Sequence, residues 1–355
     1  MAYTTIDNPT DYFTTVLTTS TGSALTIDTG FKPDWLWTKA RNQARSHELH
    51  DTTRGDNKRL KSDATTAEES YSNYLAFTST GATLGTNHNL GYHAGGSTTG
   101  VCWAWKANGG SATATGSESG SNPAYSVQAN TTAGFSIVTY TGTGSNGTVP
   151  HGLGVKPDWY IIKNRDNTTA NDGRWMVWHK SLEALHNYYS FIFLHLNNSR
   201  SEDTTVVNAT PNTTTFALGD DGMVNNDGEK YVAYCFAEKQ GYSKFGSWTG
   251  NANDDGPFIY TGFKPAFLLF KNASASERWF LSDNKRDTFN SVEKHMRPDV
   301  NEAEYSTTTS IDYLSNGFKI REDDAHMNGS DNTIIYMAFA ESPFVSSKGV
   351  PTTAR

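Results

Sequence analysis

The chain has 355 residues and a net charge of −8, with 19% charged and 12% aromatic residues. Disordered chains contain few aromatic residues, and nucleic-acid-binding proteins need a concentrated basic face, so the composition argues against both classes. No stretch approaches the roughly 18 apolar residues of a membrane helix, and the first residues lack the features of a secretion signal. The two cysteines, Cys102 and Cys235, cannot build a disulfide framework, and we expect buried, reduced thiols.

Three segments share one pattern, which predicts an internal triplication. Each begins with Gly-x-Lys-Pro and continues into an apolar run that ends in Lys, at 30–39, 154–163 and 262–271. Each copy then closes on a second apolar segment, at 101–106, 232–238 and 335–341. Proline lacks a ladder donor and belongs at the start of a strand, and a continuous apolar run indicates a strand covered on both faces. We therefore predict an all-β fold of three tandem β-sandwich-like repeats.

In chain order, the composition predicts five parts. They are a first repeat over 1–107, a Gly/Ser/Thr-rich linker or long loop over 108–133, a second repeat over 134–239, a third repeat over 240–344, and a polar tail over 345–355. The short join between the second and third repeats predicts close packing of these two, whereas the linker would let the first repeat sit apart. One helical turn is predicted over 181–185, with Ser181 as its cap.

The segment 47–50, with the sequence His-Glu-Leu-His, is the first candidate for chemistry. The zinc protease motif requires His-Glu-x-x-His on a helix, so that both rings face one ion. The spacing here differs and the segment indicates a strand or loop. We therefore predict no metal site and no cofactor.

An Asp-x-x-Arg pair recurs at matching places in the first and third copies, as Asp51 with Arg54 and Asp283 with Arg286. The second copy has His-Lys-Ser-Leu at 179–182 instead. A catalytic pair would not need two copies, so we interpret the pairs as structural ion pairs or turns.

Acidic residues cluster at 220–222, 253–256 and 322–324. Aspartate is common in turns for conformational reasons, and we interpret these segments as turns. Calcium binding is the alternative, because calcium prefers clustered oxygen ligands, although no segment has the EF-hand spacing.

Tryptophans raise the possibility of sugar binding, since sugars stack on flat aromatic rings. The repeated strand positions favour packing for at least one member of each alternating pair, Trp35 with Trp37 and Trp103 with Trp105. Four further tryptophans are similarly strand-like, namely Trp175, Trp178, Trp248 and Trp279. A pair of carboxylates for glycoside cleavage has no local signature in this sequence. We assign no catalytic, cofactor-binding or metal-binding residue, predict no enzyme, and leave ligand-binding residues open.

Six segments, at 134–142, 147–154, 231–238, 241–247, 313–319 and 336–341, together with the opening 1–7, resemble a known family. They are similar to the repeat-containing, tail-fibre-like virion proteins of marine tailed bacteriophages, including cyanophages. The resemblance implies a structural protein of the virion, assembled in the cytoplasm of the bacterial host. Its partners would be other virion proteins and further copies of itself, as a homotrimer. The long segment 108–133 would let the repeat at 1–107 dock onto the virion while the other two repeats project outward.

The resemblance implies no catalytic residues, and the chain carries no collagen-like or heptad-rich stalk. We therefore expect a compact appendage on the tail or head rather than a long fibre. Two alternatives stay open: an adhesin that binds glycans of the host surface, and a capsid decoration protein.

Overall fold

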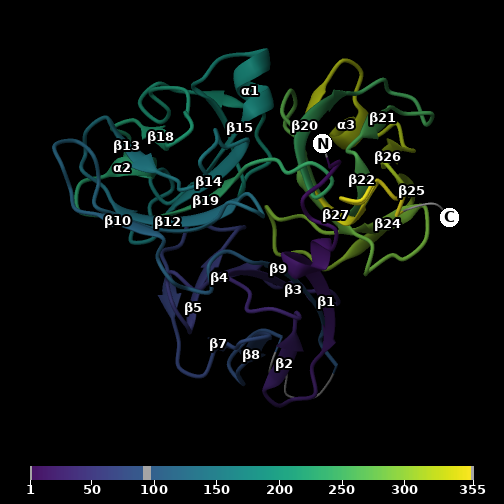
Figure 1. Ribbon diagram of the computed structural model, residues 1–355, viewed down its shortest axis with the longest axis horizontal. Helices are drawn as coiled ribbons and strands as arrows, with labels where there is room; N and C mark the ends of the chain where they lie inside the picture. Colours follow the sequence, from purple (N-terminus) through teal and green to yellow (C-terminus); the bar gives the residue numbers. More distant parts are fainter. Residues whose placement is uncertain (1, 91–96, 353–355) are drawn as a thin grey trace.

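The computed structural model describes residues 2–90 and 97–352 and confirms an all-β fold of β-sandwich-like repeats. Three lobes surround a common centre, and each lobe contains one repeat (Figure 1). The last residues of the predicted polar tail, 353–355, lie outside the described residues. No helix among the described residues is long and apolar enough to cross a membrane.

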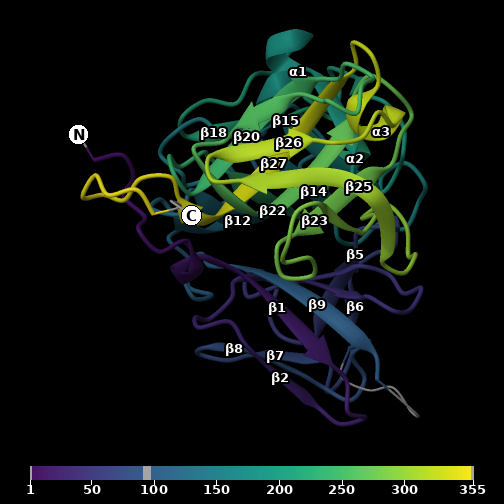
Figure 2. The ribbon, with the colours of Figure 1, turned by 90° about the vertical axis from the view of Figure 1, so that its right-hand side faces the viewer.

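The elements of the first repeat are η1 (Pro9–Asp11), β1 (Phe13–Thr19), β2 (Leu25–Asp28), β3 (Trp35–Ala40), β4 (Glu48–Asp51), β5 (Lys58–Lys61), β6 (Glu69–Ser70), β7 (Leu75–Phe77), β8 (Gly81–Leu84) and β9 (Thr99–Trp105). They form an inner sheet, ordered β1-β9-β3-β4-β5-β6, and an outer sheet, ordered β2-β8-β7. The outer sheet is the layer farthest from the other two lobes (Figure 2).

The second repeat contains β10 (Ala114–Gly116), β11 (Tyr125–Asn130), β12 (Phe135–Thr141), β13 (Gly147–Pro150), β14 (Trp159–Asn164), β15 (Trp175–His179), α1 (Lys180–Leu185), β16 (Ser190–Phe193), β17 (Ser201–Glu202), β18 (Thr215–Leu218), α2 (Gly222–Asn225) and β19 (Lys230–Phe236). Its inner sheet has the order β10-β11-β12-β19-β14-β15-β16-β17, and its outer sheet pairs β13 with β18.

The third repeat contains β20 (Ser243–Thr249), β21 (Phe258–Tyr260), β22 (Phe263–Asn272), β23 (Trp279–Asp283), β24 (Val292–His295), β25 (Tyr305–Leu314), β26 (Gly317–Ile320), α3 (Ala325–Asn328) and β27 (Thr333–Pro343). Its inner sheet has the order β20-β27-β22-β23 and its outer sheet the order β21-β26-β25-β24. The same four-strand order occurs in the other inner sheets, as β1-β9-β3-β4 and β12-β19-β14-β15, which matches the repeated sequence pattern.

One core joins all three repeats, because the inner sheets turn one face toward the centre of the molecule. Alternate residues of a strand point to opposite faces, so Trp35 and Trp37 enter this shared core while Leu36 packs against the outer sheet of its own repeat. Matching residues of the other repeats join the same core, including Trp159, Ile161, Phe236, Phe267, Leu269 and Phe339. The first repeat therefore does not sit apart, contrary to the expectation from the linker.

The segment 108–133 is not the linker that its composition predicted, since it contains β10 and β11. β11 pairs in register with β12 along its whole length, and the side chain of Val127 in β11 is buried. β10 forms the exposed edge of the inner sheet, so its residues need not be apolar. An edge strand of small polar residues has the same composition as a loop.

The predicted helical turn exists as α1, but its cap is His179 rather than Ser181. The Nδ1 atom of His179 accepts a hydrogen bond from the amide of Ser181. The two ends of the chain lie on one side of the molecule (Figure 2), where Asp7 accepts hydrogen bonds from Ser347. This contact holds the N-terminal segment against the third repeat.

Candidate functional site

The repeated Asp-Arg pairs lie at matching positions in the first and third repeats, where each aspartate ends an inner-sheet strand, β4 or β23, and the arginine follows three residues later. Asp51 is paired in register with Trp35, and Asp283 with Phe267. In the third repeat, Arg286 donates to Asp283 at 2.6 Å and to the carbonyl of Leu281 at 3.0 Å. Arg54 makes the corresponding hydrogen bonds to Asp51 and to the carbonyl of Leu49 in β4. Both pairs are buried ion pairs, as the structural interpretation predicted.

Each aspartate also accepts a hydrogen bond from the neighbouring repeat. The hydroxyl of Tyr234 in β19 donates to Asp51 at 2.7 Å, which connects the first and second repeats. The indole Nε1 of Trp103 in β9 donates to Asp283 at 3.0 Å, which connects the third repeat to the first. The two pairs therefore serve the boundaries between repeats.

The boundary between the second and third repeats uses different chemistry at the same positions. His179 occupies the place of the aspartates, Leu182 that of the arginines, and Met337 that of the donors Trp103 and Tyr234. Leu182 and Met337 are buried in the shared core. Because the thioether of Met337 cannot donate a hydrogen bond, a carboxylate at the position of His179 would have no donor in the neighbouring repeat. His179 instead approaches the carbonyl of Tyr336 at 3.3 Å through Nε2.

A second set of ion pairs extends the two polar boundaries. Glu68 accepts two bonds from Arg165 of the second repeat, at 3.0 and 2.9 Å, and one from Arg54 at 3.0 Å. Glu304 joins Arg286 to Arg41 of the first repeat in the same way. Although burial alone would raise it, the bonds from Arg165 and Arg54 lower the pKa of Glu68 to about 2. The charges of Glu68 and Glu304 are therefore paired with arginines at the boundaries between repeats.

Residues 48–50 of the histidine segment lie in β4, His47 immediately precedes this strand, and the extended backbone separates the side chains onto two faces. Glu48 and His50 point toward the local core of the first repeat, whereas His47 accepts a hydrogen bond from Trp37 on the opposite face, at 3.0 Å. A third residue, His88, joins Glu48 and His50 from the segment that follows β8. The sequence prediction compared His47 with His50 and missed this group, although Glu-x-His on a strand places both side chains on one face.

The atoms of this group, which we call the Glu-His-His cluster (Glu48, His50 and His88), lie close together. His88 Nε2 is 3.3 Å from Glu48 Oε2 and 3.3 Å from His50 Nε2, and His50 Nε2 is 3.9 Å from Glu48 Oε2. All three side chains have at most 1% of their surface exposed. Burial lowers the pKa of both histidines to about 3, so both are neutral at pH 7.

Surrounding residues orient the cluster. Glu48 Oε1 accepts hydrogen bonds from Tyr74 at 2.6 Å and from Asn89 and Arg59 at 2.5 Å. Among the described residues, Glu48 Oε2 makes no hydrogen bond, because the nearby His88 Nε2 bonds to His50 instead. His50 donates from Nδ1 to the Lys58 carbonyl at 2.8 Å, so its Nε2 carries a lone pair, which faces His88 Nε2 at 3.3 Å. His88 accepts the Leu90 amide at Nδ1, at 3.0 Å.

Two of the acidic segments cap short helices at matching positions. Asp221 accepts the amide of Met223 at the start of α2, and Asp324 accepts that of His326 at the start of α3. Asp255, in the third segment, is exposed and pairs with Lys319 at 2.8 Å. The turn interpretation accounts for these residues, and calcium binding stays the untested alternative.

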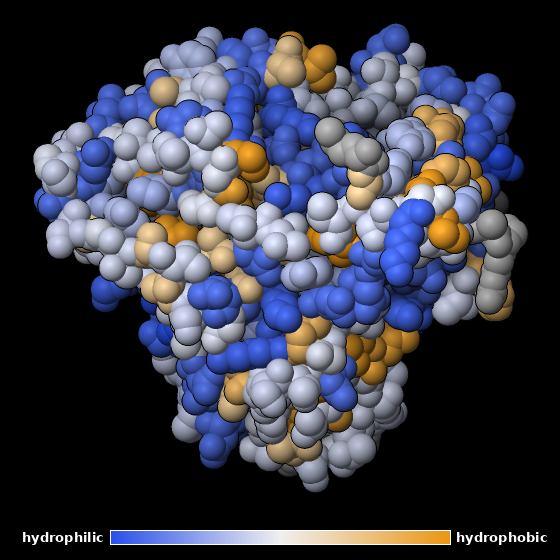
Figure 3. Space-filling model, viewed as in Figure 1, coloured by the Kyte–Doolittle hydropathy of each residue, from blue (hydrophilic) through white to orange (hydrophobic). Residues whose placement is uncertain are grey.

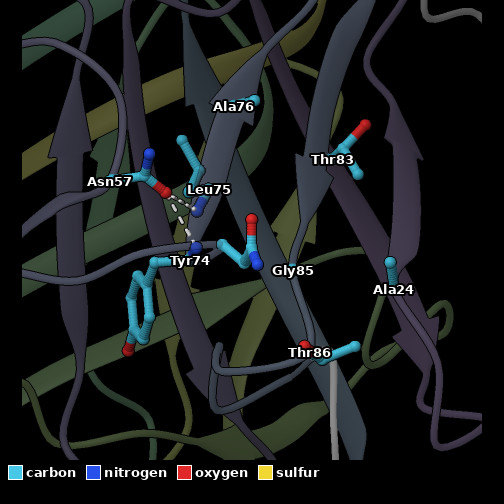
Figure 4. Close-up of a pocket in the computed structure, with 9 residues that line it drawn as sticks. Ala24, Asn57, Tyr74, Leu75, Ala76, Thr83, Gly85 and Thr86 are labelled. Carbon is cyan, nitrogen blue, oxygen red and sulfur yellow. Dashed lines mark hydrogen bonds between the residues drawn. The ribbon is translucent and has the colours of Figure 1, made fainter.

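The tryptophans considered for sugar stacking are all buried, with at most 6% of their surface exposed. A cavity of about 340 Å³ lies in the first repeat between Asn57 and Thr83 (Figure 4). Asn57 accepts the amides of Tyr74 and Leu75, at 2.8 and 3.1 Å, and the ring of Tyr74 points away from Ala76 and Thr83. The cavity therefore offers amide and hydroxyl groups but not the Tyr74 ring. Both cysteines are buried, which raises the pKa of their thiols and keeps them unreactive.

Large exposed apolar side chains are most prominent in the third repeat. Phe258 and Tyr260, two residues apart on the edge strand β21, expose 46% and 53% of their surface, and Phe289 exposes 81%. Figure 3 shows apolar residues at the surface of this lobe. Residues two apart on a strand share a face, so Phe258 and Tyr260 project together.

The fold and these contacts define an all-β protein of three sandwich-like repeats closed around one core. The chain belongs to the family described as a domain of unknown function, DUF7483, whose pattern matches residues 8–343. No curated protein and no solved structure matches the chain.

Proposed function

We propose that the protein is a structural component of a bacteriophage virion, a compact appendage attached to the tail or head. The observation that carries this proposal is the use of the repeated polar residues. Asp51, Arg54, Asp283 and Arg286 face neighbouring repeats rather than a cavity, and they tie three lobes into one block. A rigid block with several outward faces can bind several other virion proteins without changing its shape, as a structural part of a virion must.

The third repeat provides a surface for such a partner. Phe258 and Tyr260 project from an edge strand, and Phe289 is largely exposed. Aromatic residues are enriched in protein interfaces, where they bury large areas. We therefore favour the third repeat over the first as the docking side, and the homotrimer stays a prediction.

Localisation of the protein in particles tests the proposal. Antibodies against the chain should label purified particles of the phage that encodes it, at one structure of the tail or head. Labelling of the capsid surface would identify a decoration protein. Detection only in the soluble fraction of infected cells, with none in purified particles, would overturn the proposal.

Surface variants test the docking side. Phe258→Ser combined with Tyr260→Ser should lower incorporation into particles when variant and wild type compete. Leu185→Ser is the matched control, because Leu185 is 54% exposed but lies on the second repeat. Equal incorporation of both variants would exclude β21 as the docking strand.

Binding of host glycans is the second candidate, and the same exposed rings favour it. Tyr260 is held in place by a hydrogen bond between its hydroxyl and that of Tyr3, at 3.2 Å, so its ring could serve as a stacking platform. Binding of the purified protein to a glycan array, and its loss in Tyr260→Ser, would support this function. Binding to host cells without any glycan dependence would contradict it.

A further inference from the structure

We propose that the Glu-His-His cluster binds one zinc ion. The cluster offers two imidazole nitrogens and one carboxylate oxygen, which are ordinary zinc ligands. Glu48 Oε2 is the second observation that points to an ion. It is a buried carboxylate oxygen that makes no hydrogen bond among the described residues, and it lies 3.3 Å from His88 Nε2 and 3.9 Å from His50 Nε2. A buried polar atom without a partner requires an explanation, and a cation supplies one.

The distances fit one tetrahedral ion. Two ligands bound at about 2.0–2.1 Å from a tetrahedral zinc lie about 3.3–3.4 Å apart. Two of the three separations in the cluster are 3.3 Å. The third, between His50 and Glu48, is 3.9 Å and has to shorten by about 0.5 Å.

The neighbours of the cluster resemble the outer shell of a metal site. Zinc-bound histidines usually donate their other ring N–H to a carbonyl, as His50 does to Lys58. Zinc-bound carboxylates are hydrogen-bonded in turn, as Glu48 is through Oε1.

His88 has to change its tautomer when the ion binds. Its Nδ1 atom accepts the Leu90 amide, so the proton of the neutral ring resides on Nε2. Zinc takes Nε2, the proton moves to Nδ1, and the Leu90 amide loses its acceptor. The hydrogen bond between His88 Nε2 and His50 Nε2 is lost as well, and two lost hydrogen bonds are a small cost compared with the free energy that zinc sites contribute to folding.

The role of the ion follows from its position. Glu48 and His50 belong to the inner sheet of the first repeat, and His88 follows β8 of the outer sheet. Zinc would therefore cross-link the two sheets of this sandwich. The three ligands would leave the fourth position of a tetrahedral zinc to a water molecule. Because the ligands are completely buried, substrates would not reach this position, which suits a stabilising ion better than a catalytic one.

Titration of the full-length, tag-free protein with Co²⁺ and Zn²⁺ tests the proposal, after treatment with a chelator. We expect one ion per chain, the visible absorption of tetrahedral Co²⁺, its displacement by Zn²⁺, and a higher melting temperature with Zn²⁺. Substitutions of residues that only support the ligands of a zinc site weaken its zinc affinity by about 10–100-fold. His88→Gln removes a ligand itself, so it should weaken zinc binding by more than about 100-fold.

His151→Gln is the matched control. His151 also accepts an amide two residues on, Leu153 at 3.1 Å, but its Nε2 faces the carbonyl of Asn212. The control should bind zinc as the wild type does. If His88→Gln fails to fold, Glu48→Gln replaces it, because the amide keeps an acceptor oxygen for Tyr74 and removes the anionic ligand.

Three outcomes would overturn the proposal. The wild type could fail to bind zinc and show the same melting temperature with and without it. His88→Gln and Glu48→Gln could bind zinc as tightly as the wild type. Finally, His326→Gln alone could abolish binding, which would assign the ion to the partly exposed group of Glu322, Asp324 and His326 instead.

Discussion

Replacement of Arg54 by leucine tests the account of the repeat boundaries most directly. The guanidinium and the Asp51 carboxylate are both fully buried, so Arg54→Leu leaves a buried anion with few donors. Removal of one partner of a buried ion pair costs about 3–5 kcal/mol. Single domains have about 5–15 kcal/mol of stability in total, so we expect a large shift of the unfolding midpoint.

The second and third repeats suggest how to restore the lost stability. Their boundary has His179, Leu182 and Met337 at the positions of Asp51, Arg54 and Tyr234. The triple variant Asp51→His, Arg54→Leu and Tyr234→Met therefore transplants a combination that the chain already uses. It removes the buried anion together with its cation, and we expect it to recover at least about half of the loss, since neighbouring substitutions are not additive.

Equilibrium unfolding in guanidinium chloride, followed by tryptophan fluorescence, measures these differences. Arg200→Leu is the control, because its ion pair with Glu202 is about one-third exposed and such pairs contribute at most about 1 kcal/mol. Two results would refute the reasoning: a loss below about 1 kcal/mol in Arg54→Leu, or a triple variant no more stable than Arg54→Leu alone.

Four further outcomes follow from buried groups. Burial lowers the pKa of three histidines, His179, His195 and His295, from 6.5 to about 3. The stability of the protein is therefore full above pH 6.5 and decreases toward pH 3, and at pH 5 each of these histidines lowers it by about 2 kcal/mol. Acid unfolding monitored by circular dichroism would detect this loss. Burial lowers the pKa of Lys271 from 10.5 to about 7, so stability should rise between pH 7 and about 10, and Lys271→Met should flatten this rise in pH-dependent melts. Phe339→Ala should cost about 3–5 kcal/mol in denaturant unfolding, because the ring is buried in the shared core. Asp324→Ala should cost about 0.5–2 kcal/mol in the same assay, because it removes the cap of α3. An unchanged stability would contradict the buried position of Phe339 or the capping role of Asp324, according to the variant.

The strand framework could be predicted from the sequence because its signals are local. Apolar runs behind Gly-x-Lys-Pro became β3, β14 and β22, and the closing runs became β9, β19 and β27, in the same order in each inner sheet. The tryptophans on these strands are buried, as continuous apolar runs indicate.

The remaining features depend on contacts that a local pattern does not contain. β10 is polar because it forms a sheet edge, and only the pairing of β11 with β10 and β12 distinguishes this segment from a linker. His88 reaches Glu48 and His50 from a segment far along the chain, so no spacing rule could include it. The shared core was also not predictable, since a strand buried on both faces is compatible with separate sandwiches or with one closed assembly.

The unequal boundaries give the three repeats a defined order. If the Asp51 face met β27 instead of β19, its carboxylate would face Met337 rather than the hydroxyl of Tyr234. A buried acceptor without a donor costs about 1–3 kcal/mol, which penalises the wrong neighbour. Three identical boundaries would carry no such penalty, and repeats of adjacent chains could exchange places. Under the function that we propose, many copies would assemble side by side, and a part built from similar repeats would require this discrimination. The divergence at 179–182 is therefore what we expect of a chain that closes on itself before it meets its neighbours.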